Sequence, residues 1–542
     1  MKNRRNLFPF KRARVFLALM LSALLLLSGC TGGANSPSSS APSDSSSPAP
    51  VSKEDPNAGC EKGDSAKAAQ AEEEVDVAII GSELEGLYLA RAAADEGLKV
   101  KILDPRSSFG GQVLQGEMLF LDETKDESKH SLVQGRVKKL FDGFKGAKIR
   151  KTSEFEAYMT KLVDQIPLEQ GVTLGHIDTI ASNGGCSVDR IEYSTKDGKS
   201  HSIHARYWAD NTDYAALASK LKTNRLPGLE KLYGQSRPEF MSAGMIMKFK
   251  HVDWDKFSKT YNQLPASEKK ERFGGGYVNK DFAIGLSGIA KQFQPSSDRT
   301  FLRGLNAVNQ RDGEVLINAL LVYDVDPADP SSVKTAVELG NKETPRVLEL
   351  FKKTLPGWEN AEVNGFPSYL YIREYNHYES EYVMKPSDLL SGRMFWDNVS
   401  IGGYPMDLQG ITANKWGTEM GRPDKYGIPL RSFLLKGYPN VILAGKNVGV
   451  SAIAYGSVRI QPNTSLGAEM IGILIGQLPK NQNLASISRE EMSRIQGYAA
   501  SKYKIKLNGE AGKNKIKDWD QDEINKLDEG EISYTSYKPK KH

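Results

Sequence analysis

The sequence predicts an α/β fold in which a Rossmann-like dinucleotide-binding domain is split around an inserted α+β substrate domain. Two observations support this prediction. Residues Val75 to Asp104 have the pattern of a β-α-β unit, and a second buried strand followed by an apolar helix lies near residue 440. The region between them mixes strand and helix patterns, which is typical of a separate α+β layer.

The β-α-β unit begins the folded part of the chain. An apolar strand from Val75 to Ile80 ends in a glycine turn, and an Ala-rich helix is expected from about Leu87 to Glu96. A second strand, Val100 to Leu103, ends at Asp104, near the expected distance of about 20 residues from the glycines. Amides at the start of the helix can hold a diphosphate, and Asp104 can accept hydrogen bonds from a ribose. The unit therefore predicts a bound dinucleotide and favours an enzyme.

The glycine turn departs from the usual G-x-G-x-x-G pattern. Gly81 and Gly86 hold the outer positions, Ser82 follows the first glycine, and Glu83 replaces the middle one. That glycine normally lets the backbone approach the phosphates, so a carboxylate there is unfavourable unless it points away. A strand-turn-helix without a nucleotide therefore remains an alternative at this point.

Further elements follow from residue patterns along the chain. Asp197-Gly198 predicts a hairpin between two strands, Val188–Tyr193 and Ser202–Trp208, and an Ala-rich helix is expected to begin near Tyr214. The other expected strands are Met245–Phe249, Val315–Val322 and Asn440–Ala444, and the other expected helices are Phe155–Ile166, Ser332–Lys353 and Ser465–Leu474.

Length and charge limit the classes of function. The 542 residues are enough for two or more domains, and 39% hydrophobic with 26% charged residues suits a globular protein. Without the six basic side chains of residues 1–29, the net charge falls from +5 to −1, so nucleic acid is not an expected partner. The expected segments are a signal peptide (1–29), a tether and spacer (30–74), a first dinucleotide-binding part (75–225), a substrate domain (226–400), a closing part (401–480) and a charged peripheral helix and tail (481–542).

The N-terminus has the features of an export signal. A basic segment precedes an apolar run from Val15 to Leu27, which is too short for an ordinary membrane span. The run ends in Leu27-Ser28-Gly29-Cys30, which resembles a bacterial lipobox and implies lipid on Cys30. We therefore expect a protein anchored to the outer face of the cytoplasmic membrane. Arg4-Arg5 leaves Sec and twin-arginine export both open.

The remaining two cysteines, Cys60 and Cys186, either pair in an oxidising compartment or stay as free thiols. The chain contains no C-x-x-C sequence and no cysteine–histidine cluster with zinc spacing, so neither a dithiol mechanism nor a metal site is predicted.

Four separated blocks of the chain have the order and spacing of a known family. Together they span nearly all of residues 75–477, and in them the chain resembles the bacterial FAD-dependent oxidoreductases, which are distantly related to fumarate reductase flavoproteins. The blocks are the β-α-β unit with Phe109-Gly110-Gly111 after it, Tyr369–Leu390, Ile401–Gly410 with Tyr426–Leu434, and Pro439–Gly472.

The resemblance implies a GR2-type flavin fold, a small organic substrate and hydride transfer between that substrate and flavin N5. It does not identify the electron acceptor, which is oxygen, a quinone or another carrier. A helix that begins beside the flavin pyrimidine would stabilise negative charge on the reduced ring. The residues that the resemblance places against FAD are Gly81, Ser82, Glu83, Gly86, Asp104, Gly110, Gly111, Gly445, Asn463, Thr464 and Ser465.

The chain also departs from the family pattern. Asn376 and His377 stand where family members often have arginines, Gln409 stands at a common histidine position, and Asn211 lies in a reduced A-T-G motif. These departures weaken inherited catalytic assignments more than they weaken FAD binding.

Three residues are the candidates for catalysis. Arg373 is expected to bind an acidic substrate or the flavin, with an ion pair to a nearby glutamate as the alternative. His377 is the best acid–base candidate by residue type, and Arg459 precedes the closing helix. Each has a purely structural alternative. Tyr404 and Asp407 belong to a polar, aromatic block that is a further candidate for the pocket wall.

Two functions remain open on the sequence alone. The first is an extracytoplasmic flavoenzyme. The second is a surface-anchored binding protein of the same fold that has lost redox turnover. Glu83 and the missing arginines and histidine favour the second, and the intact closing block favours the first.

Overall fold

The computed structural model describes residues 60, 72–183, 185–480 and 482–538. The chain divides into two compact units, residues 1–53 and 54–542, and every described residue belongs to the second. The expected signal segment, Cys30 and most of the expected tether lie outside the described residues. Among the described helices, none is long and apolar enough to cross a membrane.

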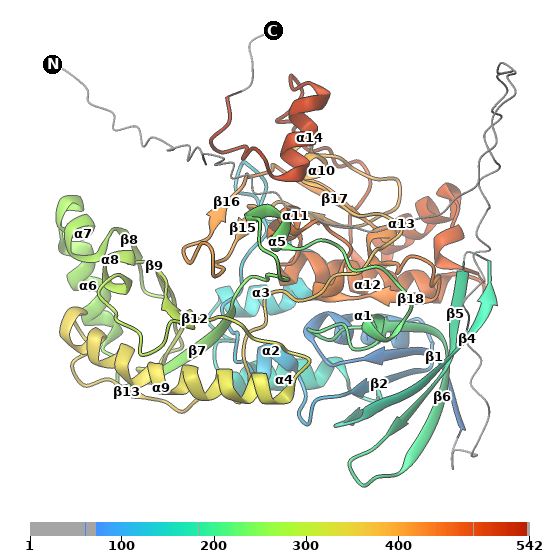
Figure 1. The fold of residues 1–542 in the computed structure, drawn as a ribbon, viewed down its shortest axis with the longest axis horizontal. Helices are drawn as coiled ribbons and strands as arrows, with labels where there is room; N and C mark the ends of the chain where they lie inside the picture. The colour runs from blue at the N-terminus through green and yellow to red at the C-terminus, as the bar shows by residue number, and fades with distance from the viewer. Residues whose placement is uncertain (1–59, 61–71, 184, 481, 539–542) are drawn as a thin grey trace, which may run out of the picture. The chain divides into compact units, whose positions relative to one another are not determined.

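The first sheet contains the predicted β-α-β unit (Figure 1). Strand β1 (Glu72–Ile80) pairs in parallel with β2 (Val100–Asp104) on one side and with β6 (Ser200–Asp210) on the other. Strand β18 (Val441–Leu443) also joins β6 in parallel, so a segment near residue 440 completes the sheet. The outer strands are β3 (Leu168–Gln170), β4 (Thr173–Ser182) and β5 (Gly185–Ser194).

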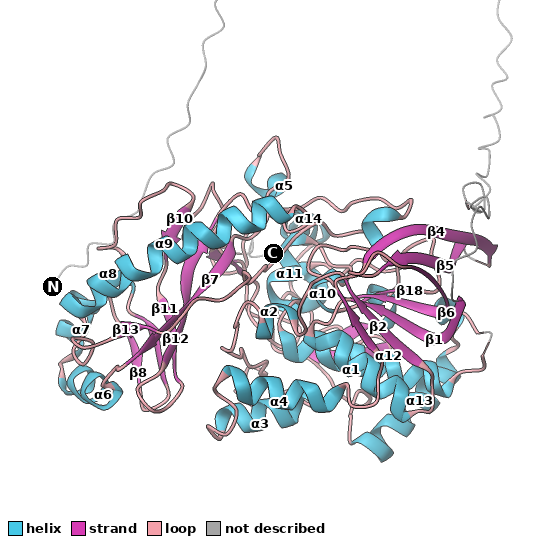
Figure 2. Ribbon diagram, turned by 90° about the horizontal axis from the view of Figure 1, so that it is seen from below, coloured by secondary structure: helices cyan, strands magenta, loops and turns pink. Residues whose placement is uncertain are grey.

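Two helices that are far apart in the sequence cover one face of this sheet. Helix α1 (Leu84–Asp95) packs against α12 (Gln461–Gln477), and Figure 2 shows both on the same side of the strands. Val77 and Ile79 of β1 enter the core on this face, whereas Ala78 and Ile80 enter a second apolar cluster. This alternation is that of a strand buried on both faces.

The second sheet is antiparallel and has its own core. Its strand order is β13-β7-β12-β11-β9-β8, with β10 also on β12, and helix α9 (Pro330–Thr354) packs against it (Figure 2). The other bounds are β7 (Ala243–Lys250), β8 (Gly276–Val278), β9 (Phe282–Gly285), β10 (Thr300–Leu302), β11 (Leu305–Asn309), β12 (Val315–Val322), β13 (Glu362–Val363), α6 (Trp254–Gln263), α7 (Ala266–Phe273) and α8 (Ser287–Ala290).

Shorter elements connect the two sheets, and the C-terminal segment packs onto the first core. Helix α13 (Arg489–Tyr503) and α14 (Gln521–Glu529) bury Met492, Ile495 and Leu527 there, so part of the expected peripheral tail belongs to the core. The connecting elements are α2 (Gly111–Leu114), α3 (Val137–Lys145), α4 (Thr152–Leu162), α5 (Leu229–Tyr233), α10 (Pro386–Leu390), α11 (Ala452–Val458), β14 (Asn398–Gly402), β15 (Asp407–Leu408), β16 (Thr418–Glu419) and β17 (Tyr426–Pro429).

The structure confirms the α/β fold class and most of the expected elements, but the helix expected from Tyr214 is wrong. Only a short 3-10 turn forms, at Ala218–Lys220. The Asp210 carboxylate accepts the amides of Leu217 and Ala218, at 2.8 and 2.9 Å, and Ala215 has a positive φ of 53°. The segment therefore wraps around a buried carboxylate, so these amides do not form helical hydrogen bonds.

The disulfide left open by the sequence is present. Cys60 and Cys186 are bonded, with their Cα atoms 5.5 Å apart. The bond attaches the segment before β1 to strand β5 of the first sheet.

Candidate functional site

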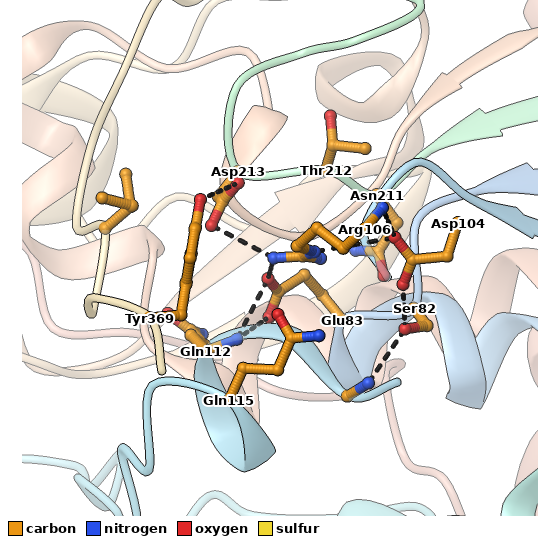
Figure 3. Close-up of polar contacts among 12 residues, drawn as sticks. Ser82, Glu83, Asp104, Arg106, Gln112, Gln115, Asn211, Thr212, Asp213 and Tyr369 are labelled. Carbon is orange, nitrogen blue, oxygen red and sulfur yellow. Dashed lines mark hydrogen bonds and ion pairs between the residues drawn. The ribbon is translucent and has the colours of Figure 1, made fainter. Parts of the chain in front are cut away.

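The predicted phosphate turn lies at the end of β1, where Gly81 has a φ of +97° that favours glycine. Ser82 donates its hydroxyl to the Asp104 carboxylate and accepts the amide of Gly110 at 2.9 Å. Asp104 is fully buried and also accepts the amide of Arg106 at 2.8 Å (Figure 3). The structure therefore brings the ends of β1 and β2 together as predicted, with hydrogen bonds between protein groups.

Glu83 does not point away from the turn. Its side chain is 1% exposed, and its Oε1 accepts a hydrogen bond from Arg106 Nη1 at 2.7 Å. The amide of Gln112 donates to both carboxylate oxygens, at 3.2 and 3.1 Å. A Cβ on Gly111, which has a φ of +46°, would collide with this carboxylate. Gly111 therefore makes room for the Glu83 side chain.

Asn211 fills the space beside three glycines that were expected to lie against FAD. Its Oδ1 accepts the amide of Gly86, in the first turn of α1, at 2.7 Å. A Cβ on Gly81 would lie 2.6 Å from the Asn211 carbonyl oxygen, and one on Gly445 would lie 2.8 Å from its Nδ2. Three of the glycines expected against FAD, Gly81, Gly86 and Gly445, therefore lie against Asn211.

The three residues expected at the closing helix lie within its first turns, because α12 begins at Gln461, with Pro462 beside its start. Asn463 donates to the Ser457 carbonyl at 3.0 Å. Thr464 donates to Glu85 Oε1 at 2.9 Å, which joins the starts of α12 and α1, while Ser465 Oγ is buried without a hydrogen-bond partner. Burial, with the negative charge of Glu83 nearby, raises the pKa of Glu85.

Two of the three catalytic candidates come together around one tyrosine. The Arg373 guanidinium lies 4.5 Å from the Tyr371 ring centre, and Arg459 Nη1 donates to the Tyr371 hydroxyl at 3.1 Å. Arg373 also donates to the Ser242 carbonyl at 2.8 Å and to Asn318 Oδ1 at 2.9 Å. Burial lowers the pKa of Arg373 to about 10. In the described part of the chain, Arg373 forms no ion pair with a glutamate.

Acidic groups and a third arginine complete this cluster. Burial raises the pKa of Asp122 to about 6, although Arg459 nearby opposes the shift, and Tyr404 is hydrogen-bonded to this carboxyl. Asp407 acts electrostatically on Arg459 and on Arg303. Tyr404 and Asp407 therefore lie near these charged groups, and their place in the pocket wall stays a prediction. We call Arg303, Arg373, Arg459, Tyr371, Asp122, Tyr404 and Asp407 the arginine cluster.

His377 lies outside the arginine cluster. Its ring packs against Tyr455, with the ring centres 4.4 Å apart, and its Nε2 is 3.8 Å from Glu374 Oε1. Burial lowers the pKa of His377 to about 4, so the imidazole is neutral at neutral pH. Among its described residues, the structure shows no contact between the His377 side chain and Arg373 or Arg459, so the acid–base role of His377 stays a prediction.

Several residues of the site have no local signal in the sequence. Asp122 and Arg303 lie in segments without a motif, and the Lys446 ammonium, which is 7% exposed, reaches Gln112 Oε1 at 3.1 Å and the Ile372 carbonyl at 2.8 Å. Arg106 follows Asp104 by two residues, and that spacing was the one available sign of its role.

One family matches the chain over most of its length. The sequence profile described as FAD dependent oxidoreductase matches residues 76–494. No curated protein sequence matches the chain.

Solved structures show only distant likeness. A geranylgeranyl bacteriochlorophyll reductase-like protein from Thermoplasma acidophilum is 11% identical, with 80% of this chain and 85% of that chain covered and a TM-score of 0.36. For p-nitrophenol 4-monooxygenase from Pseudomonas putida the identity is 11%, the coverage 78% and 84%, and the TM-score 0.35. TM-scores this low support no argument about the chain.

The residues between the phosphate turn and the arginine cluster leave no room for FAD as their side chains are arranged. Glu83 lies against Gly111, and Asn211 lies against Gly86 and Gly445. The cavity lined by Gln112, Lys446, Arg373 and Arg459 measures about 10 Å³. Sites for small molecules and cofactors are typically about 300–1,000 Å³ in size. We therefore derive no catalytic step through FAD from this arrangement.

Proposed function

Because the chain belongs to the family of FAD-dependent oxidoreductases, we propose that it is a lipid-anchored, extracytoplasmic enzyme that acts on a small organic acid. The enzyme class, oxidoreductase, and the cofactor, FAD, follow from family membership. The acid substrate, the anchor and the location are the proposed parts.

The charge of the arginine cluster supports an anionic substrate. Three guanidinium groups face two carboxyl groups, of which Asp122 has a pKa raised to about 6 by burial. The Nε of Arg459 is buried and has no hydrogen-bond partner, and this observation carries the proposal. A substrate carboxylate would satisfy it once the side chains around the cavity of about 10 Å³ move apart to admit the substrate, since guanidinium groups bind carboxylates through paired hydrogen bonds. Asp122 would hold or release a proton next to the bound acid.

Binding of a panel of small carboxylic acids, with the matching amides as controls, tests this proposal. We expect acids to raise the melting temperature and amides not to, because only the acids neutralise the arginine cluster. Arg459→Gln should weaken acid binding by roughly tenfold or more, measured by calorimetric titration. Arg422→Gln, at a 53% exposed side chain paired with Glu419, is the matched control. Equal acid binding by Arg459→Gln and the unmodified protein would contradict the proposal.

The disulfide supports a location outside the cytoplasm. Disulfides persist in oxidising compartments and are rare in the cytosol, and Cys60 and Cys186 form one here. We expect the protein in the native host's membrane fraction with no free thiol at these cysteines. Cys30→Ala should release the protein from the membrane, as cell fractionation would show. Protein in the cytoplasmic fraction with both thiols reduced would overturn the export proposal.

A further inference from the structure

The carboxylate of Glu83 lies in the cradle where the phosphate turn, Gly111 and Arg106 meet (Figure 3). We propose that Glu83 is an internal occupant of the FAD diphosphate position, so that FAD binds only when this side chain leaves Arg106 and the amide of Gln112. The inference rests on the proposed function, because it takes FAD as the ligand. It goes further by naming the residue that controls access of the cofactor.

The contacts of Glu83 are those expected of a bound phosphate. Its two oxygens receive one guanidinium hydrogen bond and share one backbone amide. Guanidinium groups and backbone amides at a turn are the donors that proteins use for phosphates. The Arg106 side chain is 10% exposed, and its Nη2 has no hydrogen-bond partner, so this guanidinium keeps a free donor for a further oxyanion.

Charge explains why Glu83 and a diphosphate exclude each other. Arg106 already faces three carboxylates: its Nη1 is 2.7 Å from Glu83 and 3.3 Å from Asp213, and its Nε is 3.6 Å from Asp104. A diphosphate would add negative charge to one cation in a buried site, where like charges repel strongly. One of the three carboxylates must therefore leave.

Glu83 and Asp213 each have one hydrogen-bond partner besides the Arg106 guanidinium, whereas Asp104 has two, and of the three only Glu83 lies in the phosphate turn itself. Asp104 also accepts from Ser82 and from the Arg106 amide, and Asp213 accepts from the Tyr369 hydroxyl at 3.3 Å. The hydrogen bonds of Glu83 are those to Arg106 and Gln112 alone among the described contacts. Its side chain also stands at the position where a glycine would leave the cradle open.

Titration with FAD of the unmodified protein and two variants tests the proposal. Glu83→Gly empties the cradle, and Glu83→Gln keeps the size of the side chain while removing its charge. We expect Glu83→Gly to bind FAD at least about tenfold more tightly than the unmodified protein, with Glu83→Gln in between. The readouts are quenching of flavin fluorescence and the rise in melting temperature with added FAD.

Glu469→Gln is the matched control. Glu469 is also 1% exposed and pairs with an arginine, Arg136, at 2.6 Å, but it does not contact the cradle. This variant should lose stability and keep the FAD affinity of the unmodified protein.

Each outcome separates this inference from the proposed function. Tight and equal FAD binding by the unmodified protein and Glu83→Gly would overturn the role of Glu83 and leave the FAD enzyme intact. Absence of FAD binding in all folded variants, with folding checked by circular dichroism, would overturn both. If Glu83→Gly failed to fold, Glu83→Gln would decide by the same comparison.

Discussion

Two buried ionisable side chains next to the arginine cluster make stability depend on pH in opposite directions. Burial raises the pKa of Glu374 to about 8, and its Oε2 accepts the amide of Met241 at 2.8 Å. Burial lowers the pKa of His377 to about 4. Both side chains are therefore held mainly in their neutral forms near neutral pH, and each adds a pH dependence to the stability of the protein.

The signs of these two effects follow from proton binding. Between pH 4.5 and about 8, folded Glu374 keeps a proton that the unfolded chain releases, so its contribution to stability falls as pH rises. Between about pH 4 and 6.5, the unfolded chain binds a proton that folded His377 does not, so stability falls as pH decreases. Of these two groups, only Glu374 changes the stability of the protein between pH 6.5 and about 8.

Glu374→Gln should therefore remove the loss of stability between pH 6.5 and 8. A carboxyl group with this pKa change loses at most about 5 kcal/mol across its whole range, and the neutral amide of glutamine loses none. We expect the variant to melt above the unmodified protein at pH 8 and close to it at pH 5. Melting curves across this pH range are the measurement. Parallel curves for the two proteins would show that Glu374 does not titrate as inferred.

At the scale of elements, residue periodicity predicted what the backbone does locally. The β-α-β unit, the β5–β6 hairpin and α9 follow from apolar patterns and turn residues, since those patterns depend on neighbours in the sequence. The helix predicted from Tyr214 was wrong because alanine content alone favours a helix. In the structure, the amides of Leu217 and Ala218 donate to the buried Asp210 carboxylate, and tertiary packing sets the position of that carboxylate. A buried carboxylate that accepts backbone amides produces no periodic pattern in the sequence.

The candidate site was also predictable only where its residues belong to one local motif. Gly81, Glu83 and Asp104 lie in a motif of fixed spacing, so their meeting at one end of the sheet was expected. The direction of the Glu83 side chain depends on Arg106 and Gln112, which lie on other segments. Likewise, Asp122, from the segment between α2 and α3, and Arg303, between β10 and β11, come near Arg459 only through tertiary packing, which no motif encodes.

At the scale of the described part of the molecule, one buried arginine lies where the second sheet packs against the first apolar core, beside apolar contacts from Ile246, Val308 and Leu316. Arg150 is 1% exposed, and its guanidinium lies between the rings of Phe144 and Phe282, 4.8 and 4.9 Å from their centres. Phe144 packs in the first core, and Phe282 begins β9 of the second sheet. Arg150 Nε donates to the Phe144 carbonyl at 2.6 Å, and Nη1 donates to the Asn309 carbonyl at 3.1 Å.

Arg150→Ala should therefore weaken the junction between the cores more than it disturbs either core. Removing the guanidinium takes away its hydrogen bonds to the carbonyls of Phe144 and Asn309 and opens a gap between two rings, at a cost of roughly 3–5 kcal/mol. We expect a lower melting temperature and a calorimetric unfolding curve that broadens or splits, because each sheet keeps a core of its own. Lys151→Ala, at an adjacent residue with the exposed partner Asp312, should change stability by less than about 1 kcal/mol. A single sharp transition at an unchanged temperature in Arg150→Ala would mean that other contacts hold the two cores together.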